Sequence, residues 1–323
     1  MTEQRRLRSR AAAGYAGLPL AAFLARRFPY HSEKEWSDLA AAGRVKLNGA
    51  EPAPGSAVAA GDLVEYFFPP RPEPRVDETV TVLYEDADLL AVDKPGNLPV
   101  HPAGRYFRNT LWTLLRERFG LAAPGIANRL DRETSGVVLV AKNPAAAACL
   151  RRQFDARTVK KTYLAVVEGE FPEAVSCRGY MRPCPGAAVR KKRLFAPAAE
   201  KSPAPGEEPN WAETDFTRVA AGGGLSAVKA EPRTGRLHQI RATLLALGFP
   251  IAGDKVYGRD ENLFLKFVAD ALTPEDRAAL RLGRQALHAL SLEFEIPSGR
   301  RLTVRAPLPA DLLSLLPPLA SLG

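Results

Sequence analysis

The sequence has few of the residues that build metal sites or disulfide scaffolds. Its 323 residues include only three cysteines and four histidines. The cysteines (Cys149, Cys177 and Cys184) form no CxxC pair and the histidines are not clustered. This argues against a zinc site and against a disulfide framework. Such cysteines fit a reducing compartment best, so we expect a cytoplasmic protein.

Longer patterns are also missing. No run of 18 or more apolar residues is present, and the charged start MTEQRRLRSR leads into no signal-peptide pattern. We therefore expect neither a membrane span nor a secretory signal. No Walker loop, GxGxxG segment or HExxH motif occurs. We accordingly expect no metal and no cofactor.

What the sequence does contain is an excess of positive charge, with a formal net charge of +9. Three groups of basic residues stand out: Arg5, Arg6, Arg8 and Arg10; Arg151, Arg152, Arg157, Lys160 and Lys161; and Arg190, Lys191, Lys192 and Arg193. Any one such group is ordinarily a solvated surface. Three groups in one chain favour a polyanionic partner such as nucleic acid.

The length and a hydrophobic content of 46% predict two domains, one of them large. We expect a disordered basic arm (1–12), a small α+β unit (13–68), a Pro-rich extended linker (69–77) and a large domain (78–323). In the small unit, Arg44 and Lys46 lie on an alternating strand that ends in an Asn-Gly turn.

The large domain mixes strands and helices without regular βαβ alternation, which predicts an α+β fold with a mixed, largely antiparallel sheet. We expect Asn109 and Asn143 to cap two helices, the second with Pro144 in its first turn. Residues 183–209 are rich in proline and charge and are predicted to form a long loop. A further helix is predicted over about 237–247.

One segment of the large domain sets a carboxylate between arginines. Asp131 stands between Arg129 and Arg132 in NRLDRETSG, and the apolar run 137–140 follows. That run is short, β-branched and bounded by glycine and Asn-Pro, so it predicts a buried strand. A second segment, TGRLHQIR, ends at Arg241. Taken singly, the first is an ordinary surface cluster and the second an ordinary helix N-terminus.

Together, ordered motifs across the large domain resemble those of the RluA-type pseudouridine synthases. NRLDRETSG is similar to the family's HRLDxxTSG, with Asn128 in place of histidine, and GRLHQIR is similar to GRTHQIR. Further matches are DKPGNLPVHP, KKTYLAVVEG, GDKVYG (253–258) and the late LHA segment. The small unit resembles the RNA-binding domain of ribosomal small-subunit protein four.

The resemblance implies roles for particular residues. Asp131 would be the catalytic carboxylate and Arg241 its partner. Tyr163 would pack against the target base, and Leu287 would line the same pocket. Arg129 would fill the space left by the extruded uridine.

The resemblance further implies an RNA partner, contacted in the small unit through Arg44 and Lys46, and we expect a monomer. Ribosomal RNA of the large subunit is favoured over transfer RNA. Two routes stay open for Asp131: addition to the anomeric carbon or removal of the ribose 2′ proton.

Two alternatives from other classes remain. One is a non-catalytic RNA-binding or ribosome-assembly protein. The other is a glycoside hydrolase using Asp131 and Glu133 as an acid/base pair, which the basic surface disfavours.

Overall fold

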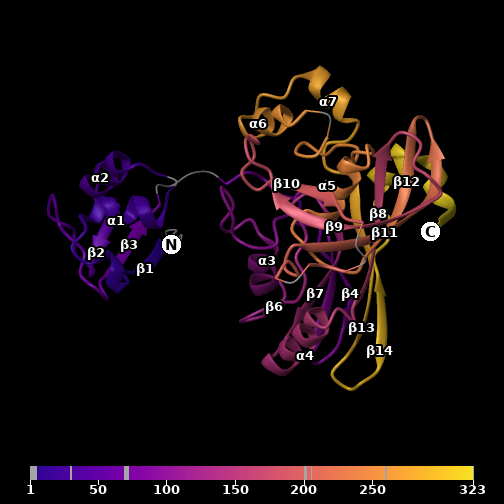
Figure 1. Ribbon diagram of the computed structural model, residues 1–323. Helices are drawn as coiled ribbons and strands as arrows, with labels where there is room; N and C mark the ends of the chain where they lie inside the picture. The colour runs from indigo at the N-terminus through magenta and orange to yellow at the C-terminus, as the bar shows by residue number, and fades with distance from the viewer. Residues whose placement is uncertain are drawn as a thin grey trace. The chain divides into compact units, whose positions relative to one another are not determined.

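The computed structural model describes residues 6–29, 31–68, 73–199, 202–204, 206–258 and 260–322. The chain divides into two compact units, Met1–Glu73 and Pro74–Gly323. Each unit has its own sheet (Figure 1). Each also has its own hydrophobic core. The division falls within the segment 69–77 that we predicted to be a linker, of which 69–72 lie outside the described residues.

The small unit packs two helices against a short sheet. Its elements are β1 (Arg6–Arg10), η1 (Ala13–Tyr15), α1 (Leu20–Arg27), α2 (Glu33–Ala41), β2 (Val45–Leu47) and β3 (Leu63–Phe67). The strands run in the order β1-β3-β2. Phe23 from α1 and Trp36 from α2 are fully buried between the helices and the sheet. Ser32 and Glu35 form a capping box that fixes the start of α2.

β1 corrects the predicted disordered arm over residues 1–12. Arg6–Arg10 pair antiparallel with β3, so the backbone groups that face β3 are hydrogen-bonded. Glu65 on β3 accepts hydrogen bonds from Arg6 Nη1 at 3.3 Å and Arg8 Nε at 2.8 Å. Part of the basic charge therefore compensates a buried carboxylate of the fold itself. Residues 1–5 lie outside the described residues.

The large unit holds the remaining elements. Its strands are β4 (Thr81–Glu85), β5 (Leu89–Lys94), β6 (Gly125–Ile126), β7 (Ser135–Ala141), β8 (Lys160–Glu168), β9 (Ala174–Pro183), β10 (Arg193–Pro197), β11 (Trp211–Gly222), β12 (Leu225–Pro232), β13 (Leu287–Glu295) and β14 (Arg301–Arg305). Its helices are α3 (Leu111–Glu117), α4 (Pro144–Asp155), α5 (Gln239–Ala246), α6 (Asn262–Val268), α7 (Pro274–Leu280), α8 (Ala310–Leu315) and η2 (Pro317–Leu322).

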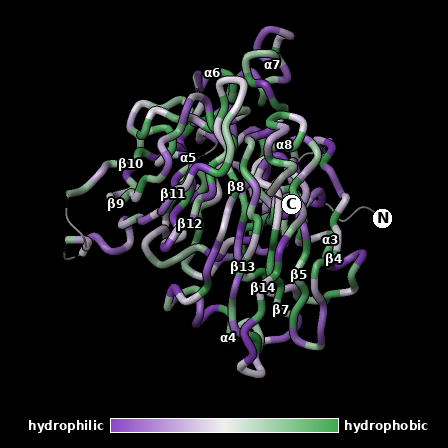
Figure 2. Tube along the Cα trace, turned by 90° about the vertical axis from the view of Figure 1, so that its right-hand side faces the viewer, coloured by the Kyte–Doolittle hydropathy of each residue, from purple (hydrophilic) through white to green (hydrophobic). Residues whose placement is uncertain are grey.

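The described strands of this unit form one 11-stranded sheet in the order β10-β9-β11-β12-β8-β13-β7-β5-β4, with β14 on β13 and β6 on β7. β7 and β13 are parallel, and the other pairs are antiparallel. This confirms the predicted α+β fold with a mixed, largely antiparallel sheet. Helices α6 and α7 lie at one end of the unit and α4 at the opposite end (Figures 1 and 2).

β7 is the buried strand predicted after Asp131, and all its residues are buried. Figure 2 shows hydrophobic residues along this strand and its neighbours β5 and β13. Gly136 allows β7 to approach β13 closely. Its φ is +112°, and a Cβ there would lie 2.2 Å from the carbonyl oxygen of Ala289. Only glycine fits this backbone and this spacing.

Two local predictions need correction. Thr110, not Asn109, caps α3, because its Oγ1 accepts from Thr113 N, while Asn109 donates to the carbonyl of Pro74. The predicted loop 183–209 contains β10, which pairs with β9. The helix predicted over about 237–247 is present as α5 (Gln239–Ala246). The cap of α4 by Asn143, with Pro144 in the first turn, is confirmed.

Candidate active site

The loop that carries Asp131 connects β6 to β7 and is held from below by a buried lysine. Lys94 is fully buried, and its Nζ donates to the carbonyl oxygens of Pro95, Leu98 and Arg132. The last of these follows Asp131 directly. Because these contacts fix the backbone beside it, Asp131 presents its side chain, 30% exposed, from a rigid support.

Arg241 on α5 joins Asp131 to a second carboxylate. Its Nη1 donates to Asp131 Oδ2 at 2.7 Å. Its Nε and Nη2 donate to the two oxygens of Asp254 at 2.7 and 2.8 Å. Asp254 is itself fixed by the backbone N–H groups of Val256 and Tyr257. The guanidinium is therefore locked in one orientation by a bidentate pair, with one nitrogen left for Asp131.

The charge of Asp131 results from two opposing effects. Burial raises the pKa of this carboxyl, but the neighbouring groups, the Arg241 guanidinium foremost, together outweigh burial, so the pKa lies below its usual value. Burial also opposes the charge of Arg241, yet Asp254 and Asp131 together raise its pKa. Asp131 is therefore ionised at neutral pH in a site that is mostly shielded from water.

His238 faces the other oxygen of Asp131. It lies just before α5, with a left-handed φ of 58°. Its Nε2 is 3.7 Å from Asp131 Oδ1, and its Nδ1 is 2.9 Å from Tyr257 Oη. Burial lowers the pKa of His238 to about 4, despite Asp131, so the ring is neutral. We therefore place the ring proton of His238 on Nε2, which faces the carboxylate of Asp131. Nδ1 then accepts a hydrogen bond from the hydroxyl of Tyr257.

Tyr163 on β8 comes close enough to Asp131 to be affected by its charge. Burial, with a contribution from Asp131, raises the pKa of Tyr163 to about 12, so it stays a neutral phenol. Its cross-strand neighbours are two alanines, Ala230 on β12 and Ala289 on β13. Leu287, two residues before Ala289 and 4% exposed, lies on the same face of the sheet.

Asn128 and Arg129 differ in what they contact. Asn128 Nδ2 donates to Val137 O at 3.0 Å, and its Oδ1 accepts from Leu139 N at 2.8 Å. This side chain thus pins the loop to β7. Arg129 is exposed and, within the described part of the chain, makes no ion pair.

Glu133 is committed to structural contacts. It accepts from Arg132 Nη2 at 2.8 Å, from Lys255 Nζ at 3.0 Å and from the backbone of Gln285. Its side chain is 12% exposed. Because its oxygens are engaged by Arg132, Lys255 and the backbone of Gln285, Glu133 is not free to act on a glycosidic bond. The geometry argues against the hydrolase alternative.

Asp254 and Tyr257 were missed as site residues at the level of sequence. Both belong to GDKVYG, a segment that we matched without assigning it a role. The sequence signal for both residues was the GDKVYG motif itself, because an aspartate followed by backbone donors can hold a buried guanidinium. The sequence could not show that this guanidinium belongs to Arg241.

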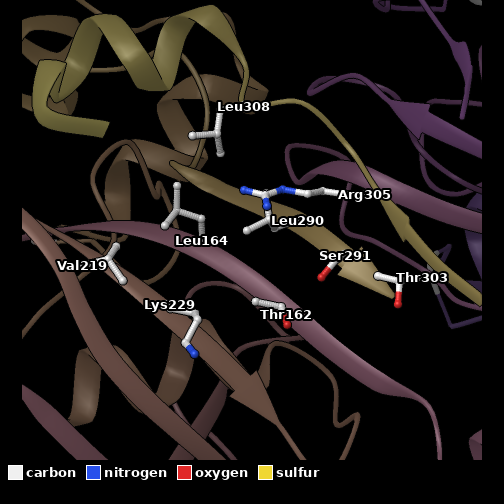
Figure 3. Close-up of a pocket in the computed structure, with 9 residues that line it drawn as sticks. All are labelled: Thr162, Leu164, Val219, Lys229, Leu290, Ser291, Thr303, Arg305 and Leu308. Carbon is white, nitrogen blue, oxygen red and sulfur yellow. The ribbon is translucent and has the colours of Figure 1, made fainter. Parts of the chain in front are cut away.

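A cavity of about 350 Å³ lies elsewhere in the large unit and does not contain Asp131. Figure 3 shows its lining by Thr162, Leu164, Val219, Lys229, Leu290, Ser291, Thr303, Arg305 and Leu308. Thr162 and Leu164 alternate with Tyr163 on β8, so this cavity is on the opposite face of the sheet from the catalytic candidates. The atoms that line this cavity are mostly apolar, and its side chains include no carboxylate that could act as Asp131 does.

Arg44 and Lys46 lie in the small unit, in a surface hollow of about 240 Å³ that Phe67 also lines. Lys46 Nζ is 5.6 Å from the centre of the Phe67 ring. Two cations beside an aromatic ring form a surface suited to a nucleic-acid strand.

Two negative findings concern the described residues. They contain no group of three or more His, Cys, Asp or Glu side chains placed to hold a metal ion. None of their helices is both long and apolar enough to cross a bilayer.

Comparison with known proteins supplies the family. The model for RNA pseudouridylate synthases matches residues 88–246, which include Asp131, Tyr163 and Arg241. A protein of Chlorobaculum parvum named an uncharacterized RNA pseudouridine synthase is 36% identical over 284 residues, 84% of each chain. The chain belongs to the RNA pseudouridine synthase family.

Other relatives of this synthase act on different RNAs by name. Ribosomal large subunit pseudouridine synthase D of Xanthomonas campestris pv. campestris is 33% identical over 309 residues, 93% of this chain and 88% of that one. The mitochondrial tRNA pseudouridine(32) synthase of Saccharomyces cerevisiae is 36% identical, over 68% of this chain but only 46% of the yeast protein. The solved structure of human RNA pseudouridylate synthase domain containing 1 aligns with a TM-score of 0.58 and 28% identity, covering 75% of this chain and 89% of that one.

Proposed function

We propose that this synthase isomerises uridine in large-subunit ribosomal RNA, with Asp131 as the essential carboxylate. The observation that carries the proposal is the pairing of a partly exposed Asp131 with Arg241 at 2.7 Å. That pairing keeps the carboxylate ionised where it can reach a bound nucleotide.

The reaction needs an anion at this point by either open route. The bond from ribose C1′ to the ring nitrogen breaks, the base turns, and a new bond joins C1′ to ring carbon C5. The hydrogen of C5 is released to solvent as a proton, and the freed ring nitrogen takes up a proton. Asp131 acts either as the nucleophile at C1′ or as the base that removes the 2′ proton. A protonated Asp131 could do neither.

The side chains around Asp131 suit the holding of a detached base. Tyr163 presents a neutral ring beside two small neighbours, and stacking on a base contributes about 1–3 kcal/mol. Leu287 adds apolar surface on the same face. Arg129, exposed and unpaired among the described residues, fills the place of the uridine once that base leaves the helical stack.

Ribosomal RNA is favoured because the relative named for large-subunit ribosomal RNA matches more of this chain than the relative named for transfer RNA. The Xanthomonas protein matches 93% of the chain, which includes part of the small unit, whereas the yeast transfer-RNA enzyme matches 68%. The small unit contributes Arg44 and Lys46 as RNA contacts. Modification of transfer RNA is the second candidate.

Asp131→Asn tests the essential role, because it removes the charge and keeps the size of the side chain. We expect tritium release from RNA labelled at uridine C5 to fall by at least about 10³-fold, while affinity for the same RNA changes little. Asp155→Asn, an exposed aspartate at the end of α4, is the matched control and keeps full activity.

Ordinary turnover by Asp131→Asn would overturn the assignment of this carboxylate. A wild-type protein that binds RNA without releasing tritium would instead favour the non-catalytic alternative. Comparing pseudouridine maps of total RNA with and without the gene identifies the substrate, and a lost site in transfer RNA alone would contradict the ribosomal target.

A further inference from the structure

A group of three cations lies on the active face of the sheet and is not used by the chemistry at Asp131. Lys161 stands two residues before Tyr163 on β8, so both side chains point to the same face. Arg157 lies in the turn that leads from α4 into β8, with a left-handed φ of 58°. Arg236 lies in the segment between β12 and α5, two residues before His238.

Strand pairing explains why these three segments meet. β12 pairs antiparallel with β8, with Ala230 opposite Tyr163, so the chain that leaves β12 toward Arg236 passes beside Lys161. Burial, then Arg157 and then Arg236, lower the pKa of Lys161, and burial with Arg157 lowers the pKa of Arg236. The three charges are therefore close enough to repel one another.

The positive charge of this group is not neutralised by the fold. Within the described part of the chain, no carboxylate forms an ion pair with Arg157, Lys161 or Arg236. Arg236 is nonetheless held in place: its Nε donates to Trp211 O at 3.0 Å and its Nη2 to Glu208 O at 2.9 Å. Both acceptors are uncharged backbone carbonyls, so they orient the guanidinium without cancelling its charge.

The neighbouring lysine shows the contrast. Lys160 points to the other face of β8 and pairs with Glu293 on β13 at 3.1 Å. On one face of β8, Lys160 has a carboxylate as its neighbour. On the other face, the neighbours of Lys161 are two further cations. Unpaired, partly buried cations cost stability unless a ligand compensates them.

We propose that Arg157, Lys161 and Arg236 bind one backbone phosphate of the RNA strand that carries the extruded uridine. This inference rests on the proposed function, because it takes that strand as the ligand. A phosphodiester offers the single negative charge and the acceptor oxygens that the group lacks. The site is placed to anchor the strand beside Tyr163 and Asp131, since Lys161 and Arg236 are each two residues from a group next to that carboxylate.

The test measures RNA binding without turnover. The probe is an unmodified transcript of large-subunit ribosomal RNA, bound to the full-length chain carrying Asp131→Asn at a series of KCl concentrations. Lys161→Gln should weaken affinity by about tenfold, as expected for a lost charge-assisted contact. It should also make the slope of log affinity against log salt shallower by about 1.

Lys160→Gln is the matched control, with the same loss of charge at the adjacent residue on the opposite face. It should leave both affinity and slope unchanged. Lys161→Arg should retain the wild-type slope. Lys161→Gln should unfold at the same temperature as the parent chain or at a higher one, because it removes repulsion between cations. If it unfolds at a lower temperature, Arg157→Gln replaces it in the binding comparison, since Arg157 is exposed.

Equal losses for Lys160→Gln and Lys161→Gln would overturn the proposal, as would no affinity of the parent chain for the transcript. The result is separable from the proposed function. Absent tritium release by the wild type would remove the catalytic proposal, whereas the binding comparison would still decide whether these cations hold a phosphate.

Discussion

At the scale of the residue, the site depends on a guanidinium shared between two carboxylates. Arg241 donates hydrogen bonds from two of its nitrogens to Asp254 and from the third to Asp131. Asp254 is almost fully buried, at 1% exposure, and Asp131 is 30% exposed. The buried member orients the cation, and the exposed member is left available to a substrate. This division of roles explains why one arginine can both support the fold and tune a reactive group.

Replacing Arg241 should change the pH dependence of the enzyme. In the wild type the pKa of Asp131 lies below its usual value, so protonation of this carboxylate should lower kcat/KM only in the acidic range. In Arg241→Gln the effect of burial is no longer outweighed, and the pKa of Asp131 rises above the usual value. The rate then falls, as pH is lowered, at a higher pH than in the wild type.

Tritium release measured between about pH 4 and 8 should show this shift as an acid limb that lies at higher pH in Arg241→Gln than in the wild type. Arg241→Lys keeps a cation in place and is the control, with an acid limb close to that of the wild type. If Arg241→Gln is slow at every pH but its acid limb does not move, Arg241 contributes by positioning and not by holding the charge of Asp131.

The sequence named residues where a family motif covers them, and the resemblance implied the pairing of Arg241 with Asp131, but the other contacts of the site were not readable. Asn128 departs from the family's histidine, yet the structure shows it bonded to β7 through both ends of its amide. No local pattern predicts that bond. Asp254 likewise reaches Arg241 only because a turn after α5 brings it back, over 13 positions of sequence.

At the scale of the element, local chemistry predicted what is local. The apolar run of β7 and the Asn143-Pro144 start of α4 carry their own signals, and both elements are present. β10 was missed because its short, proline-flanked sequence becomes a strand only by pairing with β9. The predicted basic arm became β1 for the same reason, since β3 supplies its partner.

The parallel contact of β7 with β13 depends on Gly136, and this gives a prediction on stability. Gly136→Ala places a methyl group 2.2 Å from Ala289 O at a φ of +112°, so either the strands separate or the backbone must rotate. We expect a loss of about 3 kcal/mol or more in the free energy of unfolding, measured by urea denaturation.

Gly283→Ala is the matched control, because its Cβ would meet nothing within 4 Å and its φ is not positive. It should change stability by less than about 0.5 kcal/mol. Equal stability of the two variants would mean that β7 and β13 can part without cost. That outcome would also weaken the view that this contact fixes the loop of Asp131.

At the scale of the whole molecule, the two units have separate cores. The buried clusters of the large unit contain no residue before Val76, and that of the small unit contains none after Phe68. Sequence composition indicated this division through the prolines of segment 69–77. It could not indicate how the units cooperate on RNA, because neither core depends on the other.

Removal of residues 1–73 therefore should leave the large unit folded and its chemistry intact. A chain of residues 74–323 keeps all three of its own clusters, and we expect cooperative unfolding together with a kcat within about twofold of the full chain. Its KM for unmodified ribosomal RNA should rise by about tenfold or more, because a tethered second module raises the effective concentration of substrate at the site.

The double variant Arg44→Gln with Lys46→Gln in the full chain should reproduce a large part of that rise in KM without changing kcat. A truncated chain with an unchanged KM would show that the small unit does not hold this RNA, and a truncated chain with a normal KM but lost kcat would place part of the catalytic machinery in the small unit.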